Sequence, residues 1–147
     1  MRGTARRRAA RLFLDANTII SGLAFEGAER ALLRAHVLGA FVGVTSDYVL
    51  VQVRRVSVDK LARALEDVDR ALAEFAFVVV DEGDRALLAE TRTLLRDPTD
   101  APVLAAALAA GVDGLVTGDK DLHTAPVKAR LRVFTTREAL EWIEAER

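Results

Sequence analysis

The sequence contains no cysteine among its 147 residues, and this absence excludes several kinds of protein. Without cysteine there can be no disulfide scaffold, no thiol catalysis and no zinc or iron–sulfur site with cysteine ligands. The two histidines, His36 and His123, lie far apart and show no metal-ligand spacing, so a histidine-based zinc site is not expected either. A metal site in this chain would therefore use oxygen ligands.

Long apolar runs are missing as well. No stretch is long enough to span a bilayer, and the N-terminus lacks the hydrophobic region of a secretory signal. We therefore expect a cytoplasmic protein without membrane contact. Hydrophobic residues make up 51% of the chain and charged residues 29%, which is typical of one globular domain with a buried core.

The net charge of −1 is unevenly distributed. Five of the 21 basic residues are arginines near the N-terminus: Arg2, Arg6, Arg7, Arg8 and Arg11. The rest of the chain then carries 16 basic and 22 acidic residues, a net charge of −6. We expect residues 1–10 to form a disordered basic extension and residues 11–147 to form the domain. An arginine-rich arm can also contact the phosphates of a nucleic acid, and the sequence leaves both interpretations open.

Strand-like and helix-like segments alternate along the chain. Short apolar runs predict strands at 12–15, 41–45, 77–80, 114–117 and 131–134. Amphipathic or apolar segments predict helices at 28–38, 47–56, 59–75, 85–95, 101–110 and 137–145. This alternation favours a single α/β sandwich, in which helices cover both faces of a parallel sheet and the strand ends lie along one edge.

Three aspartates each stand where an apolar run meets a break. Asp15 ends one predicted strand, Asp119 follows another, and Asp100 opens a predicted helix. Because strand ends and adjoining helix starts form one rim of such a sheet, we expect these carboxylates to lie close together. At about 5 Å and an effective dielectric near 20, each pair repels by roughly 3 kcal/mol. A divalent cation removes this repulsion, and hard oxygen ligands suit Mg²⁺ or Mn²⁺.

The residues around the first aspartate allow two interpretations. Asp15 can be a metal ligand whose orientation is set by a hydrogen bond from Asn17 or Thr18. It can equally be the N-cap of a helix, a position that aspartate favours. Asp100 differs, because helical periodicity directs its carboxylate to the buried side, and Asp97 or Thr99 is the better cap.

The third segment places two carboxylates after Gly118. Asp119 is the better ligand candidate, and Asp121 is suited to positioning a water molecule. Thr117 can orient a carboxylate or a bound water. A solvated turn is the alternative for this segment, so the prediction of a site depends on all three segments together.

Together these segments resemble the PIN domain, a family of magnesium- or manganese-dependent ribonucleases that includes toxins of bacterial toxin–antitoxin pairs. The resemblance covers about residues 11 to 140 and rests, in order, on LFLDANTIISG, TSDYVLVQVRRV, DPTDAPVLAAALAAG and LVTGDKDL. It implies a three-layer α/β/α sandwich with an acidic metal site, an RNA substrate, an antitoxin partner and a homodimer. Three residues correspond to the first, third and fourth acids of the family: Asp15, Asp100 and Asp119. Three more fall on flanking polar positions: Asn17, Thr117 and Asp121.

The second acid of the family is where this sequence departs. The family usually has a glutamate in the helix after the second strand, and the matching residue here is Gln52. Gln52 shares one helical stripe with Val49, Val53 and Val56, so we expect it to face inward. Its amide oxygen can face a metal or a water, but it supplies no negative charge and no base. The sequence therefore leaves open reduced activity or none.

Two other functions remain open at this point. Asp15-Ala16-Asn17-Thr18 loosely resembles the signature of haloacid-dehalogenase-type phosphatases, but Asn17 cannot replace their acid and no lysine stands between Lys60 and Lys120. A catalytically impaired PIN-like module that binds RNA or protein is the second alternative. The phenylalanines could suggest base stacking, but their apolar surroundings predict core packing for four of them: Phe25, Phe41, Phe75 and Phe77.

Overall fold

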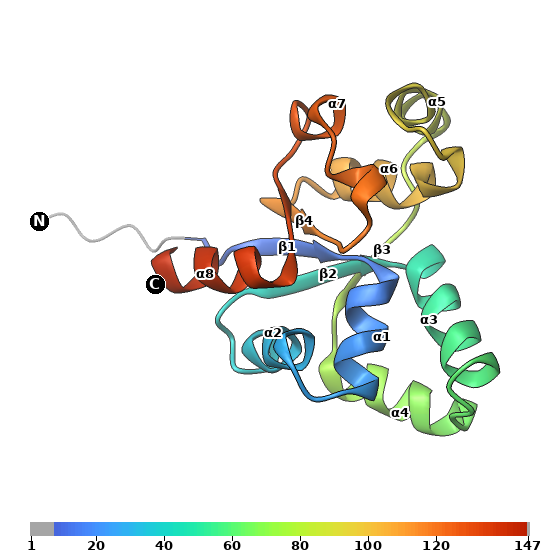
Figure 1. Ribbon diagram of the computed structural model, residues 1–147, viewed down its shortest axis with the longest axis vertical. Helices are drawn as coiled ribbons and strands as arrows, with labels where there is room; N and C mark the ends of the chain where they lie inside the picture. The colour runs from blue at the N-terminus through green and yellow to red at the C-terminus, as the bar shows by residue number, and fades with distance from the viewer. Residues whose placement is uncertain (1–7, 147) are drawn as a thin grey trace, which may run out of the picture.

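The computed structural model describes residues 8–146, which form a five-stranded parallel sheet covered by helices (Figure 1). The strands are β1 (Arg11–Leu14), β2 (Val42–Ser46), β3 (Val78–Val80), β4 (Gly114–Val116) and β5 (Val133–Phe134). They lie in the order β3-β2-β1-β4-β5, and every neighbouring pair is parallel. The predicted strands are thus confirmed, although their ends differ by one or two residues.

Eight α-helices and two short 3₁₀ helices connect the strands within the described residues. The helices before the third strand are α1 (Ala16–Ala24), α2 (Ala28–Val37), α3 (Asp47–Asp59) and α4 (Leu65–Phe75). The later ones are α5 (Arg85–Leu94), η1 (Pro98–Asp100), α6 (Ala101–Ala110), η2 (Lys120–Leu122), α7 (Ala125–Lys128) and α8 (Thr136–Glu146). In Figure 1, α1, α2 and α4 lie on one side of the sheet, and α5, α6 and α7 lie on the other. This is a three-layer α/β/α sandwich, as the resemblance implied.

The order of the strands determines where a site can form. The chain passes from β1 outward through β2 to β3, then returns to the other side of β1 to form β4 and β5. The direction in which successive strands are added to the sheet therefore reverses between β1 and β4, although the two strands themselves are parallel. In parallel α/β sheets the crevice at the carboxyl ends of two such strands is the usual place for a ligand.

The centre of the sheet forms the rigid base of this crevice. Leu12, Phe13 and Leu14 of β1 are fully buried, since helices cover both faces. Leu115 and Val116 of β4 are fully buried as well. Strand ends that emerge from so tightly packed a core hold the residues that follow them in fixed positions.

The boundary between two predicted helices is displaced. The helix expected over 47–56 is α3 and extends to Asp59, and the helix expected over 59–75 is α4 and starts only at Leu65. Between them Ala62 has a left-handed φ of 54°, and the N–H of Arg63 donates to the carbonyl of Ser57. No glycine or proline marks this break in the sequence. No helix range was predicted for residues 16–24, but α1 lies there with Asp15 as its N-cap, which is one of the two interpretations that the sequence left open for Asp15.

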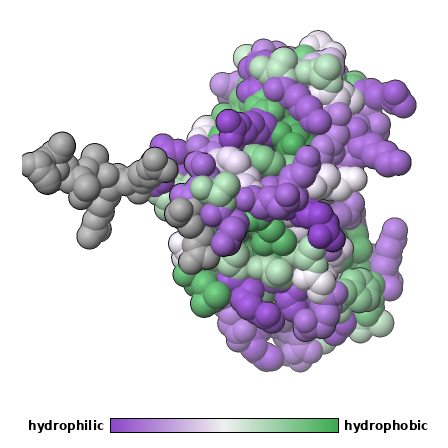
Figure 2. Space-filling view, turned by 60° about the vertical axis from the view of Figure 1, so that its left-hand side comes forward, coloured by the Kyte–Doolittle hydropathy of each residue, from purple (hydrophilic) through white to green (hydrophobic). Residues whose placement is uncertain are grey.

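One aromatic residue is also not where the sequence placed it. Phe41 and Phe77 are buried as expected, and Phe75 stacks on Phe77, whereas Phe25 is 58% exposed. Phe25 follows α1 as its C-cap residue, where the chain has already left the core. Figure 2 shows one face of the surface, on which polar side chains predominate and apolar ones gather in smaller patches.

The basic extension predicted at residues 1–10 lies largely outside the described part of the chain, which begins at Arg8. Residues 8–10 precede β1 and have no regular secondary structure. Within residues 8–146, none of the helices combines the length and the apolar character needed to cross a membrane.

Candidate metal centre

The predicted site lies at the carboxyl edge of the sheet, where the ends of β1 and β4 meet. Asp15 directly follows β1, and its backbone N–H donates to the carbonyl of Val116 at 3.1 Å. Thr117 directly follows β4, and its hydroxyl donates to the Asp15 carboxylate at 2.7 Å. Asp15 and Thr117 are 102 positions apart in the sequence, and they are in direct contact in the crevice between β1 and β4.

Asp15 is both a helix cap and a member of the acidic site. Its Oδ1 accepts a hydrogen bond from the N–H of Ala16 at 2.7 Å, and its Oδ2 accepts the bond from Thr117. Only 8% of the residue is exposed. Burial raises the pKa of Asp15, the two hydrogen bonds oppose this shift, and the negative charge of Asp119 adds to it. Each carboxylate oxygen keeps a second lone pair, so capping does not prevent coordination.

Thr117 connects two of the carboxylates. Its buried hydroxyl donates to Asp15 and accepts the backbone N–H of Asp119 at 3.0 Å. Its carbonyl lies 2.7 Å from Nε2 of His123, and since a carbonyl only accepts, this ring nitrogen carries the hydrogen. The sequence analysis gave His123 no such role, because contact with the backbone of Thr117 leaves no pattern in the sequence.

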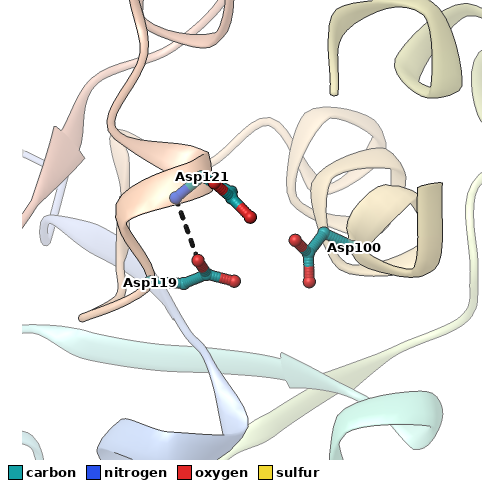
Figure 3. A group of neighbouring side chains, drawn as sticks. All are labelled: Asp100, Asp119 and Asp121. Atoms are coloured by element: carbon teal, nitrogen blue, oxygen red, sulfur yellow. Dashed lines mark hydrogen bonds between the residues drawn. The ribbon is translucent and has the colours of Figure 1, made fainter. Parts of the chain in front are cut away.

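Three carboxylates converge on one point at this edge. Ligand oxygens of Asp100, Asp119 and Asp121 all lie within 4.8 Å of one another. Figure 3 shows Asp100 at the start of α6 directed toward Asp119 and Asp121, which come from the η2 segment. Oδ1 of Asp119 accepts the backbone N–H of Asp121 at 2.9 Å, and this bond orients the Asp119 carboxylate.

Asp100 carries the clearest electrostatic strain of the site. Its Oδ2 is buried and has no hydrogen-bond partner within residues 8–146. Burial, followed by the negative charge of Asp119 and by hydrogen bonding of the protonated Asp100 carboxyl to Asp119, raises the pKa of Asp100 to about 7, and the charges of Asp97 and Asp15 add smaller contributions. Asp100 stands at the N-cap position of α6, although its side chain makes no capping bond there. Asp97, one of the two predicted caps, instead caps the preceding η1 by accepting from the N–H of Thr99.

Three of the aspartates, Asp15, Asp100 and Asp119, line a cleft of about 160 Å³ at the edge of the sheet, whereas Asp121 and Thr117 are not part of its lining. Five of the predicted site residues line it: Asp15, Asn17, Gln52, Asp100 and Asp119. Asn17 is exposed in the first turn of α1, and Gln52 is half-buried on α3. The inward stripe of α3 is confirmed, since Val49 and Val53 are fully buried. The cleft is also lined by Arg55, which the sequence analysis did not consider.

The family model of the PIN domain matches residues 11–121. The chain belongs to the PIN domain family. Its members are nucleases, and the match extends from the start of β1 to Asp121, so it includes all seven of the residues predicted to form the site. No curated protein matches the sequence significantly.

Solved structures show that the chain has the same fold as other PIN domains. VapBC2 from Rickettsia felis, bound to a DNA fragment from its promoter, matches with a TM-score of 0.64 and 17% identity over 85% of this chain and 98% of that chain. A toxin–antitoxin complex from Klebsiella pneumoniae matches with a TM-score of 0.61 and 20% identity over 85% of this chain and 97% of that chain. FitAcB from Neisseria gonorrhoeae matches with a TM-score of 0.61 and 20% identity over 86% of this chain and 98% of that chain.

The residues of this PIN domain fit a hard divalent cation. The donor set consists of oxygens, several carboxylates lie within reach of one ion, and one of their buried oxygens has no partner among residues 8–146. The tightest group differs from the predicted ligand set: Asp121 joins Asp100 and Asp119, while Asp15 lines the same cleft beside them.

Proposed function

We propose that this PIN domain is a Mg²⁺- or Mn²⁺-dependent ribonuclease that hydrolyses RNA phosphodiester bonds as the toxin of a bacterial toxin–antitoxin pair. The observation that carries the proposal is the unpartnered, buried oxygen of Asp100 beside Asp119 and Asp121. Such a cluster is unfavourable by itself and becomes favourable when a dication neutralises it. The geometry therefore supports a site that is built to hold a metal.

We assign each predicted site residue a part in hydrolysis. Asp100, Asp119 and Asp15 would hold the cation, and Thr117 keeps the Asp15 carboxylate aligned through its 2.7 Å hydrogen bond. When bound, the cation supplies Lewis acidity toward a phosphate oxygen and the attacking water. Asp121 would accept a hydrogen bond from a water molecule and orient it toward phosphorus, and Asn17, which is exposed and lines the cleft, would contact the substrate.

Gln52 lowers the activity that this arrangement can reach. It lies on the wall of the cleft at the place of the usual glutamate, but its amide carries no charge. A second cation would have one carboxylate fewer to hold it, so we propose that the enzyme is weaker than members with the full set of acids.

The partners in this proposal are an RNA substrate, an antitoxin protein and a second copy of the chain. The similar structure from Klebsiella pneumoniae is a toxin–antitoxin complex, which supports an antitoxin partner here. Light scattering of the purified chain with and without its antitoxin measures the homodimer and the complex separately.

Cleavage of single-stranded RNA in manganese tests the proposal. We expect the wild-type chain to cleave, and Asp15→Asn or Asp119→Asn to abolish cleavage. Asp59→Asn is the matched control, since Asp59 is exposed at the end of α3 and the substitution changes the charge equally. Unchanged cleavage in Asp119→Asn would remove Asp119 from the site.

The neutral Gln52 also favours a second candidate, a non-catalytic RNA- or protein-binding module. Titration calorimetry separates the two, because a nuclease binds manganese and an inactive module does not. The haloacid-dehalogenase alternative has little support from the cleft, whose lining contains an arginine and no lysine. Failure of beryllium fluoride to trap the protein would exclude it.

A further inference from the structure

Beside the apolar Val56, helix α3 contributes two polar side chains to the acidic cleft, Gln52 and Arg55. They are three residues apart, so they project from the same side of the helix. Arg55 is exposed and lines the cleft together with Asp15, Asp100 and Asp119. A cation therefore stands on the wall of a cleft that otherwise carries negative charge.

Two adjacent arginines of α3 differ sharply in their surroundings. Nε of Arg54 lies 2.7 Å from Oδ1 of Asp69 on α4, in a bond that ties the two helices together. The side chain of Arg55 forms neither an ion pair nor a hydrogen bond with any other residue of the described range 8–146. The guanidinium of Arg55 is therefore available to a ligand, whereas that of Arg54 is not.

The residue at position 52 contributes to this availability. A glutamate there would stand three residues before Arg55, at the spacing of a helical ion pair, and would compete for its guanidinium. Gln52 is neutral and offers no such pair. The same substitution that removes a carboxylate from the cleft leaves an arginine free beside it.

We propose that Arg55 binds the phosphate backbone of the substrate at the mouth of the cleft, an inference that rests on the proposed ribonuclease function. An anionic phosphodiester that approaches three carboxylates is repelled by them, and a cation on the facing wall offsets this repulsion. The guanidinium group presents paired N–H donors that match two phosphate oxygens, which a lysine ammonium cannot do with the same geometry.

Binding of a fluorescein-labelled single-stranded RNA, measured by anisotropy in calcium, tests the contact directly. We expect Arg55→Ala to weaken binding about tenfold or more, since hydrogen bonds to charged groups are the strong ones. Arg55→Lys should restore only part of the affinity. Arg54→Ala is the matched control and should stay within about twofold of wild type, because Asp69 already neutralises Arg54. The slope of log K for RNA binding against the logarithm of the salt concentration should also become less negative by about 0.7 in Arg55→Ala.

Manganese affinity gives a readout that distinguishes a lost contact from a damaged fold. Arg55→Ala removes the positive guanidinium group from the wall of the cleft, so the affinity of this variant for manganese should equal or exceed that of the wild type. A variant that merely loosened α3 would bind both manganese and RNA more weakly, and this result would overturn the assignment.

The outcomes separate this inference from the proposed function. RNA binding by Arg55→Ala equal to that of Arg54→Ala, in a wild type that cleaves RNA, would overturn the Arg55 contact and leave the ribonuclease intact. A wild type that binds RNA through Arg55 without cleaving it would support the contact and refute the ribonuclease. A wild type that binds no RNA would refute both.

Discussion

Asp100→Asn should stabilise the metal-free protein at pH 8. A carboxylate oxygen of Asp100 lies within 4.8 Å of one from Asp119, which corresponds to a repulsion of about 3 kcal/mol at an effective dielectric near 20. Partial exposure to solvent reduces this repulsion to about 1–2 kcal/mol. For a chain of this length the gain corresponds to a rise in Tm of roughly 3–6 °C.

The pH dependence of this gain has a definite sign. The pKa of Asp100 is raised from 3.8 to about 7, so between these pH values the folded protein holds a proton that the unfolded chain has lost. The stability of the wild type therefore falls as pH rises through this window. Asp100→Asn lacks this loss, and its advantage should be small near pH 4 and complete above pH 7. The raised pKa of Asp15 acts in the same direction in both proteins, so Asp100→Asn removes only the pH dependence that comes from Asp100 and from its interaction with Asp15.

Thermal unfolding at pH 4.5 and pH 8 in a chelator measures the effect, with Asp59→Asn as the control for the change in net charge. Saturating manganese should raise the Tm of the wild type and have much less effect on Asp100→Asn, because a ligand stabilises only the state that binds it. An Asp100→Asn variant that is less stable than wild type at pH 8, or a difference that does not depend on pH, would show that the carboxylates do not repel one another.

Three further substitutions test the site and the sheet beneath it. Gln52→Glu should tighten manganese binding about tenfold, or roughly 1.4 kcal/mol, and raise the cleavage rate; calorimetry without a gain would show that residue 52 does not contact the ion. Thr117→Val removes the hydroxyl that donates to Asp15, so the free energy of unfolding should fall by about 1–3 kcal/mol and RNA cleavage should slow. An unchanged melting temperature and cleavage rate would mean that this hydrogen bond is unimportant. Gly114→Ala would place a Cβ 2.4 Å from Cε2 of Phe134, and denaturant unfolding should show a loss of about 1–3 kcal/mol, whereas wild-type stability would mean that β5 moves aside freely.

The part of this structure that could be predicted is the part in which local pattern and tertiary environment agree. Runs such as Leu12-Phe13-Leu14 are apolar on both sides, and the structure buries them between two helical layers. The polar residues that end such runs stand at strand ends, and parallel topology brings those ends together. The positions of Asp15, Asp100 and Asp119 at one edge follow from this rule, and five of the seven predicted residues line one cleft.

The features that could not be predicted depend on contacts between distant segments. His123 meets the carbonyl of Thr117 only after the chain folds back at η2, and Arg55 differs from Arg54 only because Asp69 lies opposite one of them. The break after α3 depends on a left-handed alanine, Ala62, which carries no residue-type signal of the kind that glycine gives. Helical periodicity identifies the face on which a residue lies, but not its partner.

A crystal structure of the protein soaked in manganese, with anomalous diffraction data, tests the central claim most directly. We predict an anomalous peak in the cleft, with oxygens of Asp100 and Asp119 at coordination distance, about 2.0–2.4 Å. Well-ordered carboxylates with no peak between them, or a peak bound elsewhere on the surface, would contradict the account.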